Sequence, residues 1–297
     1  MTIQSVCVLG GTGFVGRHIV RLLCAQGVAV RVPTRSAVKA RHASASLPVE
    51  TVSADVHDVA QLAKLFAGVD AVINLVGILH EQGSSTFQRA HIELPRKVIE
   101  AARIAGVGRL LHMSALNAAP DGPSAYLRSK GEAEMLVQAG GLQATLFRPS
   151  VIFGAGDSFL NMFAKLAGWA PVLPLACADA KFQPVWVENV AQVFVHCLND
   201  AASIGQRYDL CGPQVYRLRE LVMFAAACRG RYPFIVPLPK PVAFMQASVM
   251  EWLPVKLMTR DNFYSMQQDS VCSCAFPFDI TPARLEDIAP QYLAYNQ

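Results

Sequence analysis

A glycine-rich turn near the N-terminus limits what this chain can fold into more than any other feature. Glycines at positions 10, 13 and 16 follow the apolar run Ser5–Leu9 and begin the amphipathic pattern Gly16–Gln26. The first glycine permits a tight turn, the second lets a ligand approach the backbone, and the third lets a helix pack closely on a strand. A helix that begins at such a turn presents free N–H groups and the positive end of its dipole to an anion. The turn therefore predicts a strand–loop–helix unit that binds a diphosphate.

Strand and helix patterns alternate through the first half of the chain. Strands separated by helices of this length pair in parallel through right-handed crossovers. We therefore expect an α/β fold, a doubly wound parallel sheet of the Rossmann type with a smaller C-terminal lobe. The predicted strands after the first are Val28–Val32, Glu50–Ser53, Ala71–Val76, Arg109–Met113 and Gln143–Arg148, and the later helices are Val59–Phe66, His91–Ala105, Ala125–Gln138 and Val190–Leu198.

Prolines and shorter elements change the rhythm after Ser150. We therefore expect residues 1–150 plus about 183–203 to form a dinucleotide-binding domain. Residues from about 151–182 and 204–297 are expected to form a smaller lobe that contacts a substrate or partner.

The end of the second predicted strand indicates which dinucleotide is bound. An NAD-binding fold presents Asp or Glu about 20 residues after the glycine turn, whereas this chain reads VPTR at Val32–Arg35. Arg35 is either a ligand for a 2′-phosphate or a solvated loop cation. We expect NADP(H), with NAD(H) less favoured. The expected contacts are Gly10, Thr12, Gly13, Phe14, Val15, Gly16, Arg35, Asp55, Val56, Asn74, Val76, Gly77, Lys130, Pro149 and Val151. Asn74 has a second interpretation, as a turn former.

A tyrosine and a lysine lie four residues apart on one predicted helix. Tyr126 and Lys130 therefore project from the same face. A phenol of ordinary pKa is a poor acid–base group near neutral pH, and a neighbouring ammonium lowers that pKa. The pair predicts a general acid–base site. Ser114 ends the strand before this helix and is either a third catalytic residue or a strand cap.

These motifs together resemble an extended or atypical short-chain dehydrogenase/reductase of the NAD-dependent epimerase/dehydratase type. More narrowly, two segments are similar to the NADPH-binding accessory subunit of respiratory complex I and its bacterial relatives. The resemblance implies that Tyr126 is the acid–base residue, that Lys130 holds the nicotinamide ribose, and that Ser114 orients a substrate carbonyl. It rests on the GxxGxxG turn, the YxxxK pair, Arg148–Gly154 and Pro184–Ala191, and its narrower form on Ser124–Glu132 and Gly205–Leu221.

Three positions depart from that family's pattern. Ala115 and Leu116 stand where a second hydroxyl is frequent, and His91 stands near a position where Asn is frequent. These departures favour an NADP(H)-binding protein in which the nucleotide has a structural or sensing role, linked to a respiratory NADH dehydrogenase complex. The alternative is an active NAD(P)-dependent oxidoreductase or sugar-nucleotide epimerase/dehydratase that uses Tyr126 and Lys130.

Composition excludes other classes and partners. The net charge of +4 is spread along the chain without a Lys or Arg run, so we expect no nucleic-acid partner. Cys272 and Cys274 are separated by one residue, which is the spacing of neither a zinc knuckle nor a CxxC redox pair. We therefore expect no metal site and reduced structural cysteines in a cytoplasmic protein.

Two apolar, Met- and aromatic-rich stretches have two interpretations. Asn161–Trp169 and Phe244–Leu253 are predicted to be helical. They pack in the core, or they line an apolar pocket or rest on a membrane surface. The second interpretation would place the protein at the periphery of the inner membrane, beside a respiratory-complex or membrane-surface partner.

Overall fold

The computed structural model describes residues 2–34, 48–252 and 257–294, so Arg35 lies outside the described residues. The chain divides into two compact units. The first unit comprises Met1–Pro120, Ser129–Arg148 and Val190–Tyr208, and the second comprises Asp121–Arg128, Pro149–Asn189 and Asp209–Gln297.

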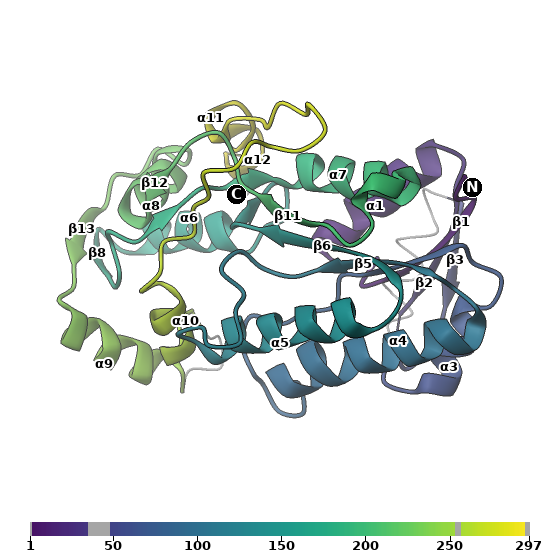
Figure 1. Cartoon of the computed structure of the whole chain (residues 1–297). Coiled ribbons are helices and arrows are strands. Elements are labelled where there is room, and N and C mark those ends of the chain that lie inside the picture. Colours follow the sequence, from purple (N-terminus) through teal and green to yellow (C-terminus); the bar gives the residue numbers. More distant parts are fainter. Residues whose placement is uncertain (1, 35–47, 253–256, 295–297) are drawn as a thin grey trace. The chain divides into compact units, whose positions relative to one another are not determined.

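A seven-stranded parallel sheet forms the centre of the first unit. Its spatial order is β11-β6-β5-β4-β1-β2-β3 (Figure 1). The chain crosses from β3 back to β4 on the other side of β1, so β1 has β2 on one edge and β4 on the other. This reversal is the point at which doubly wound folds bind their ligands. The strands are β1 (Ser5–Leu9), β2 (Ala29–Pro33), β3 (Val49–Val52), β4 (Ala71–Asn74), β5 (Arg109–Met113), β6 (Gln143–Pro149) and β11 (Arg207–Leu210).

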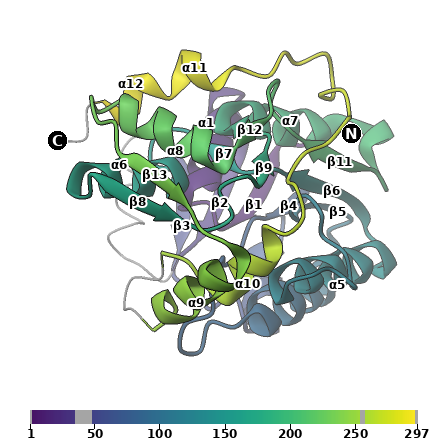
Figure 2. The same cartoon turned by 90° about the vertical axis from the view of Figure 1, so that its left-hand side faces the viewer.

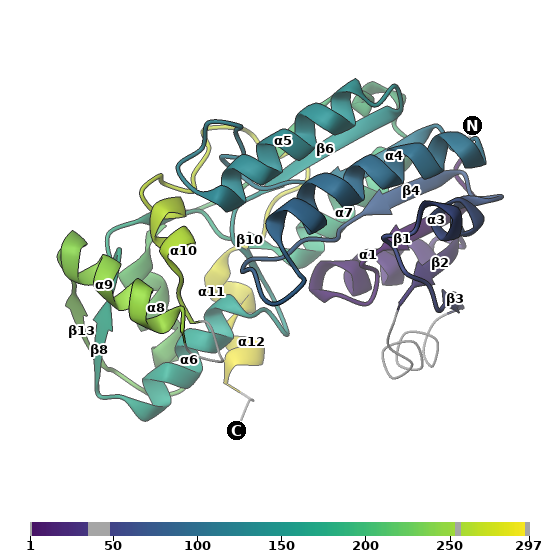
Figure 3. The ribbon, with the colours of Figure 1, turned by 90° about the horizontal axis from the view of Figure 1, so that it is seen from below.

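Helices cover both faces of this sheet, which confirms the predicted doubly wound fold. Helices α3, α4 and α5 lie along one face, and α1 and α7 lie along the other (Figures 1 and 3). The strands are apolar along their length because both faces are buried, and Leu9, Val72 and Leu110 have almost no exposed surface. The helices are α1 (Phe14–Ala25), α3 (Val59–Phe66), α4 (Leu94–Ala105), α5 (Ala125–Ala139) and α7 (Val187–Asn199), with the 3-10 turn η2 (Ala201–Ser203).

Most predicted element bounds agree with the structure to within two residues. The helix predicted as Val190–Leu198 begins three residues earlier, at Val187, and two other differences have local reasons. β4 ends at Asn74, two residues before the predicted Val76, because the Asn74 side chain accepts the Val76 N–H and turns the chain. The helix predicted from His91 begins as a π-helix, η1 (Gln88–Glu93), and becomes α-helical only at Leu94. Pro95 has no N–H to donate to the His91 carbonyl, so the α-helical hydrogen-bond ladder is interrupted there.

Short helices and three two-stranded sheets make up the second unit. β7 pairs with β10, β9 with β12, and β8 with β13, and Figure 2 shows the last pair side by side. Phe153, Leu160, Leu221 and Leu285 belong to its main apolar cluster. The elements are β7 (Ile152–Phe153), α6 (Phe159–Trp169), β8 (Val172–Leu175), β9 (Lys181–Phe182), β10 (Val185–Trp186), β12 (Tyr216–Arg217), α8 (Leu218–Ala227), β13 (Phe234–Pro237), α9 (Lys240–Met250), α10 (Arg260–Ser265), α11 (Leu285–Ile288) and α12 (Pro290–Leu293).

The helices give no sign of a membrane span. Within the ranges that the structure describes, none is both long enough and apolar enough to cross a bilayer.

Candidate functional site

The glycine turn joins β1 to α1, and its geometry requires glycine. Gly10 has a φ of +82°, in the left-handed region. The Gly13 N–H donates to the Gly10 carbonyl at 2.9 Å. A Cβ at Gly16 would lie 2.2 Å from that same carbonyl oxygen and 2.7 Å from the Gly11 Cα. Gly16 therefore lets α1 lie directly against the turn, as the sequence pattern predicts.

The first turn of α1 presents unused backbone donors. Among the described residues no side chain caps its start at Gly13, and the first turn contains no acidic residue. The N–H groups of Phe14, Val15 and Gly16 therefore have no acceptor within the helix, and the helix dipole makes this end positive. Thr12, half-buried, precedes the cap. The arrangement suits a diphosphate.

The residues after β2 and β3 form a second group of predicted contacts. The Thr34 N–H donates to the Val52 carbonyl at 2.9 Å, so β2 stays paired to its end. Asp55 accepts the His57 N–H at 3.0 Å, and its own N–H donates to Gln61. Asp55 therefore shapes the turn into α3, and half-buried Val56 follows it.

Asn74 is buried and its side chain is already engaged. Its Oδ1 accepts the Val76 N–H at 3.2 Å, and its Nδ2 lies 3.2 Å from Nδ1 of His112. Burial lowers the pKa of His112 to about 3, with a smaller contribution from Lys130, so the imidazole is neutral near pH 7. Asn74 thus forms the turn at the end of β4, and its contact with the cofactor stays a prediction.

Gly77 leaves room for the Lys130 side chain. A Cβ at Gly77 would lie 3.1 Å from the Lys130 Nζ and 3.4 Å from the His91 Nε2. Lys130 is 5% exposed, and its Nζ donates to the Met113 carbonyl at 3.1 Å. Burial lowers the pKa of Lys130 to about 8, although Glu134 opposes this shift. A buried lysine with a lowered pKa, beside the strand ends, is a feature of functional sites.

His91 connects this lysine to the turn after β4. Its Nε2 accepts the Ile78 N–H at 3.1 Å, and its Nδ1 lies 2.9 Å from the Ser129 Oγ. Burial, followed by the charge of Lys130, lowers the pKa of His91 to about 2, so the ring is neutral. The π-helical turn η1 carries His91 into this position.

Ser114 directly follows β5, and its hydroxyl is buried. The residue is 3% exposed, and its N–H donates to the Phe147 carbonyl at 2.7 Å. In the part of the chain that the structure describes, the Oγ has no hydrogen-bond partner. The hydroxyl therefore does not cap the strand.

Tyr126 lies in the first turn of α5, one turn before Lys130, and its pKa differs from the expectation. Asp261 accepts the N–H groups of Ala125 and Tyr126 at 2.6 and 3.2 Å. Burial, followed by the charge of Asp261, raises the pKa of Tyr126 to about 12. The predicted lowering of this pKa by Lys130 is therefore wrong in the structure, because desolvation and a carboxylate dominate.

Pro149 and Val151 belong to the second unit. Two hydrogen bonds hold Ser150, the residue between them. Pro149 ends β6, and the Val151 carbonyl accepts the Val185 N–H at 3.0 Å. The Ser150 N–H donates to Leu210 at 3.0 Å, and its Oγ donates to the Ser270 carbonyl at 2.9 Å.

Three cysteines come together in the second unit, contrary to one expectation. Cys272 and Cys274 form a disulfide, so the prediction of reduced thiols is wrong for this pair. Their Cα atoms are 5.4 Å apart, within the range that a disulfide can bridge. The Cys211 sulfur lies within 4.8 Å of both. The sequence spacing could not reveal this, because Cys211 is distant along the chain.

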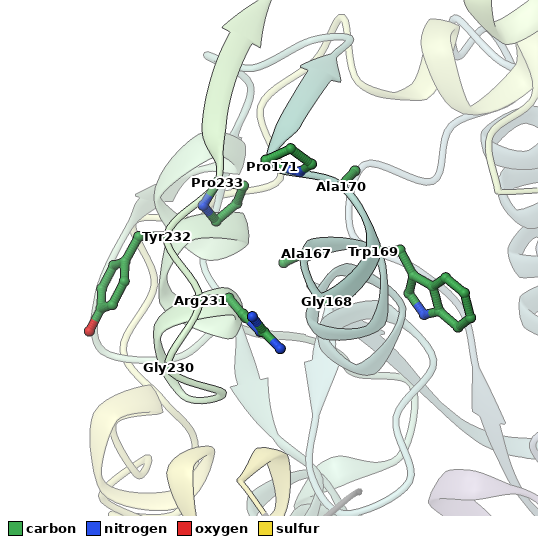
Figure 4. Close-up of a pocket in the computed structure, with 9 residues that line it drawn as sticks. All are labelled: Ala167, Gly168, Trp169, Ala170, Pro171, Gly230, Arg231, Tyr232 and Pro233. Carbon is green, nitrogen blue, oxygen red and sulfur yellow. The ribbon is translucent and has the colours of Figure 1, made fainter.

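A pocket in the second unit contains none of the predicted site residues. Its volume is about 310 Å³, and it lies between the end of α6 and the start of β13 (Figure 4). Trp169, Arg231 and Tyr232 line it together with small residues and prolines. Trp169 is 90% exposed and Tyr232 is 75% exposed. Figure 4 shows both aromatic rings pointing away from the space between the two loops.

The family follows from a comparison with known proteins. Residues 6–211 match the NAD dependent epimerase/dehydratase family, and the chain belongs to this family. The chain is therefore an NAD(P)-binding protein of the short-chain dehydrogenase/reductase type, as the motifs predict.

Two curated relatives and one solved structure are similar to this chain. The chain is 32% identical over 259 residues to NADH dehydrogenase (ubiquinone) 1 alpha subcomplex subunit 9, mitochondrial, of Arabidopsis thaliana, which covers 84% of this chain and 64% of the relative. It thus spans less than two thirds of that relative's length. It is 31% identical to the ceramide reductase of Caulobacter vibrioides, over 80% of this chain and 74% of the reductase. An NADPH-dependent quinone oxidoreductase from Escherichia coli, solved with NADPH, has the same fold, with a TM-score of 0.77 and 21% identity. The match covers 97% of this chain and 99% of the oxidoreductase.

Proposed function

We propose that this chain binds NADP(H) at the turn between β1 and α1 and uses the nucleotide as a structural or sensing element. The observation that carries this proposal is the uncapped start of α1, which Gly16 allows to lie against the Gly10 carbonyl. These amide groups are suited to a diphosphate.

The preference for the phosphorylated cofactor rests on the residues after β2. No Asp or Glu stands at Val32–Arg35, and Arg35 is the cation that would hold a 2′-phosphate. NADPH should therefore bind more tightly than NADH. The Arg35→Ala variant should lose that difference while it retains the diphosphate contacts.

A partner of the respiratory NADH dehydrogenase type is the second part of the proposal. The similarity to a subunit of that enzyme supports it. Large apolar side chains of the second unit also remain exposed, among them Trp169 and Trp252, each at 90%, and Met245 and Val249, at 61% and 63%. Exposed apolar side chains are frequent where a protein contacts a partner or a membrane. We infer that these side chains contact the partner or the adjacent membrane.

Calorimetry with NADPH and NADH tests the nucleotide proposal. The Gly13→Ala variant should bind NADPH at least about tenfold more weakly, since its Cβ occupies the space where the backbone approaches the diphosphate. Gly108→Ala is a matched control, because a Cβ there contacts nothing within 4 Å. If the folded wild-type protein binds neither nucleotide, the proposal fails.

Active redox chemistry is the second candidate, and Ser114 favours it. Its buried hydroxyl, without a partner among the described residues, is available to a substrate carbonyl. A bound nicotinamide would supply or accept the hydride, and Tyr126 would move the proton. A phenol with a pKa of about 12 can donate a proton but is a poor base near neutral pH, so Tyr126 would serve carbonyl reduction better than alcohol oxidation.

One pair of measurements separates the two roles. Native mass spectrometry should show NADP(H) that remains bound through purification, and a panel of carbonyl substrates should leave that nucleotide unoxidised. Turnover that is lost in Tyr126→Phe would instead establish an enzyme.

A further inference from the structure

The three-cysteine cluster of the second unit, Cys211, Cys272 and Cys274, has no role in the proposed nucleotide function. Cys211 directly follows β11 and is buried, whereas Cys272 is half-buried and Cys274 is exposed. All three sulfur atoms lie within 4.8 Å of one another. The cluster therefore combines two distant segments of the chain and reaches the surface at one member.

The side chain of Gln183 holds the two cysteine-bearing segments together. Its Oε1 accepts the Cys272 N–H at 3.0 Å, and its Nε2 donates to the Gly212 carbonyl at 2.7 Å. The Gly212 N–H in turn donates to the Gln183 carbonyl at 3.2 Å. The Cys272 backbone and the segment at Gly212, next to Cys211, are thus held by hydrogen bonds that do not involve the disulfide itself.

We propose that Cys211, Cys272 and Cys274, once the disulfide is reduced, form a binding site for a thiophilic divalent cation such as Zn²⁺. Three sulfur ligands select a soft or borderline cation over Mg²⁺ or Ca²⁺, which prefer oxygen. Three sulfur atoms that already lie this close can share one tetrahedral zinc ion at bond lengths of about 2.3 Å. The exposed side of the cluster at Cys274 leaves the fourth position to water.

The disulfide is the closed state of this site. Two molecules of a small monothiol reduce it: the bond between the Cys272 and Cys274 sulfurs breaks, one disulfide forms between the monothiols, and two electrons enter the protein. A divalent cation then forms three metal–sulfur bonds and displaces up to three thiol protons. Oxidation reverses the first step and expels the cation.

The site would stabilise the place in the second unit where the segments at Ser150, Leu210 and Ser270 meet. Leu210, next to Cys211, accepts the Ser150 N–H, and Ser270, close to Cys272, accepts the Ser150 hydroxyl. A cation that links the two cysteine-bearing segments would therefore reinforce the contacts that fasten Ser150. This consequence does not depend on nucleotide binding, so either proposal can fail without the other.

Titration of the reduced full-length chain with Co²⁺ tests the site. The protein is reduced with a phosphine and kept without oxygen, and Co²⁺ should give a thiolate-to-metal charge-transfer band that ends at one equivalent and disappears when Zn²⁺ is added. The oxidised protein should give no band.

Single variants identify the ligands. Cys211→Ser should weaken Co²⁺ binding at least about 100-fold, and exposed Cys274→Ser should do the same if the buried substitution prevents folding. Cys228→Ser, a free cysteine elsewhere in the second unit, is the matched control and should bind normally. The proposal is overturned if the reduced, folded wild type gives no band, if the oxidised form binds equally, or if both ligand variants bind as the wild type does.

Discussion

Replacing Lys130 with Met should stabilise the fold at neutral pH, although Lys130 is predicted to be a site residue. Lys130 is 5% exposed, and the neighbouring His91 is neutral. The Met113 carbonyl is the acceptor that the structure gives it. Met has a similar length without the charge, so the substitution removes the cost of desolvation and loses one hydrogen bond.

The magnitude follows from the pKa of Lys130, which burial lowers from 10.5 to about 8. The unfolded chain therefore holds this proton more tightly than the folded chain does. Below pH 8 the folded state bears the full cost of the buried charge, about 3 kcal/mol. As the pH rises from 8 to 10.5 the folded state is neutral while the unfolded state still holds its proton, so the cost shrinks steadily and has disappeared once the unfolded side chain is neutral as well. The lost hydrogen bond offsets about 1 kcal/mol of the gain from Met.

Urea denaturation of the wild type and Lys130→Met at a series of pH values measures this effect. The variant should be more stable by about 2 kcal/mol at pH 7. This difference should shrink by about 2 to 3 kcal/mol between pH 7 and pH 10, because only the wild type gains stability over that range. Lys165→Met, at an exposed position of α6, should show no such trend. A difference that stays constant with pH would refute the buried-charge reasoning.

Three further changes test other parts of the structure. Gly16→Ala should cost about 3 kcal/mol in urea denaturation, because its Cβ would lie 2.2 Å from a carbonyl oxygen of the turn; a wild-type midpoint would show that the turn can relax. Glu134→Gln should cost about 3 kcal/mol in the same assay, since it leaves the mostly buried Arg148 guanidinium without its carboxylate; an unchanged midpoint would contradict this. Asp261→Asn keeps a helix-capping oxygen but removes a charge, so ultraviolet difference titration should show a lower Tyr126 pKa; an unmoved pKa would count against the assigned cause.

Local patterns predicted the sheet and the glycine turn well. The strands Ser5–Leu9 and Arg109–Met113 and the helix Val59–Phe66 occupy the predicted residues. Each depends on contiguous apolar periodicity, which records burial directly. The need for glycine at position 16 was also predictable, because the atoms that leave no room for a Cβ belong to residues only a few positions away in the chain.

Contacts between distant residues were not predictable from these patterns. Asp261 contacts the start of α5 from 135 residues away, and it contributes to a tyrosine pKa opposite to the expected one. Cys211 meets Cys272 only because the fold brings the end of β11 beside a later segment. Neither partner has a characteristic spacing, and the sign of a pKa shift depends on burial, which a four-residue spacing does not specify.

The buried charge of Lys130 explains why the chain would retain a bound nucleotide that only stabilises the fold. Burial of the Lys130 charge costs about 3 kcal/mol at neutral pH. A ligand present at 100 times its Kd stabilises the folded state by about 2.7 kcal/mol. The two terms are of similar size, so NADP(H) at the proposed site would offset the destabilisation that the lysine introduces. A chain that had lost turnover but retained Lys130 would still depend on its nucleotide for stability. The amount of folded protein would then follow the concentration of NADP(H), which is what a sensing role requires.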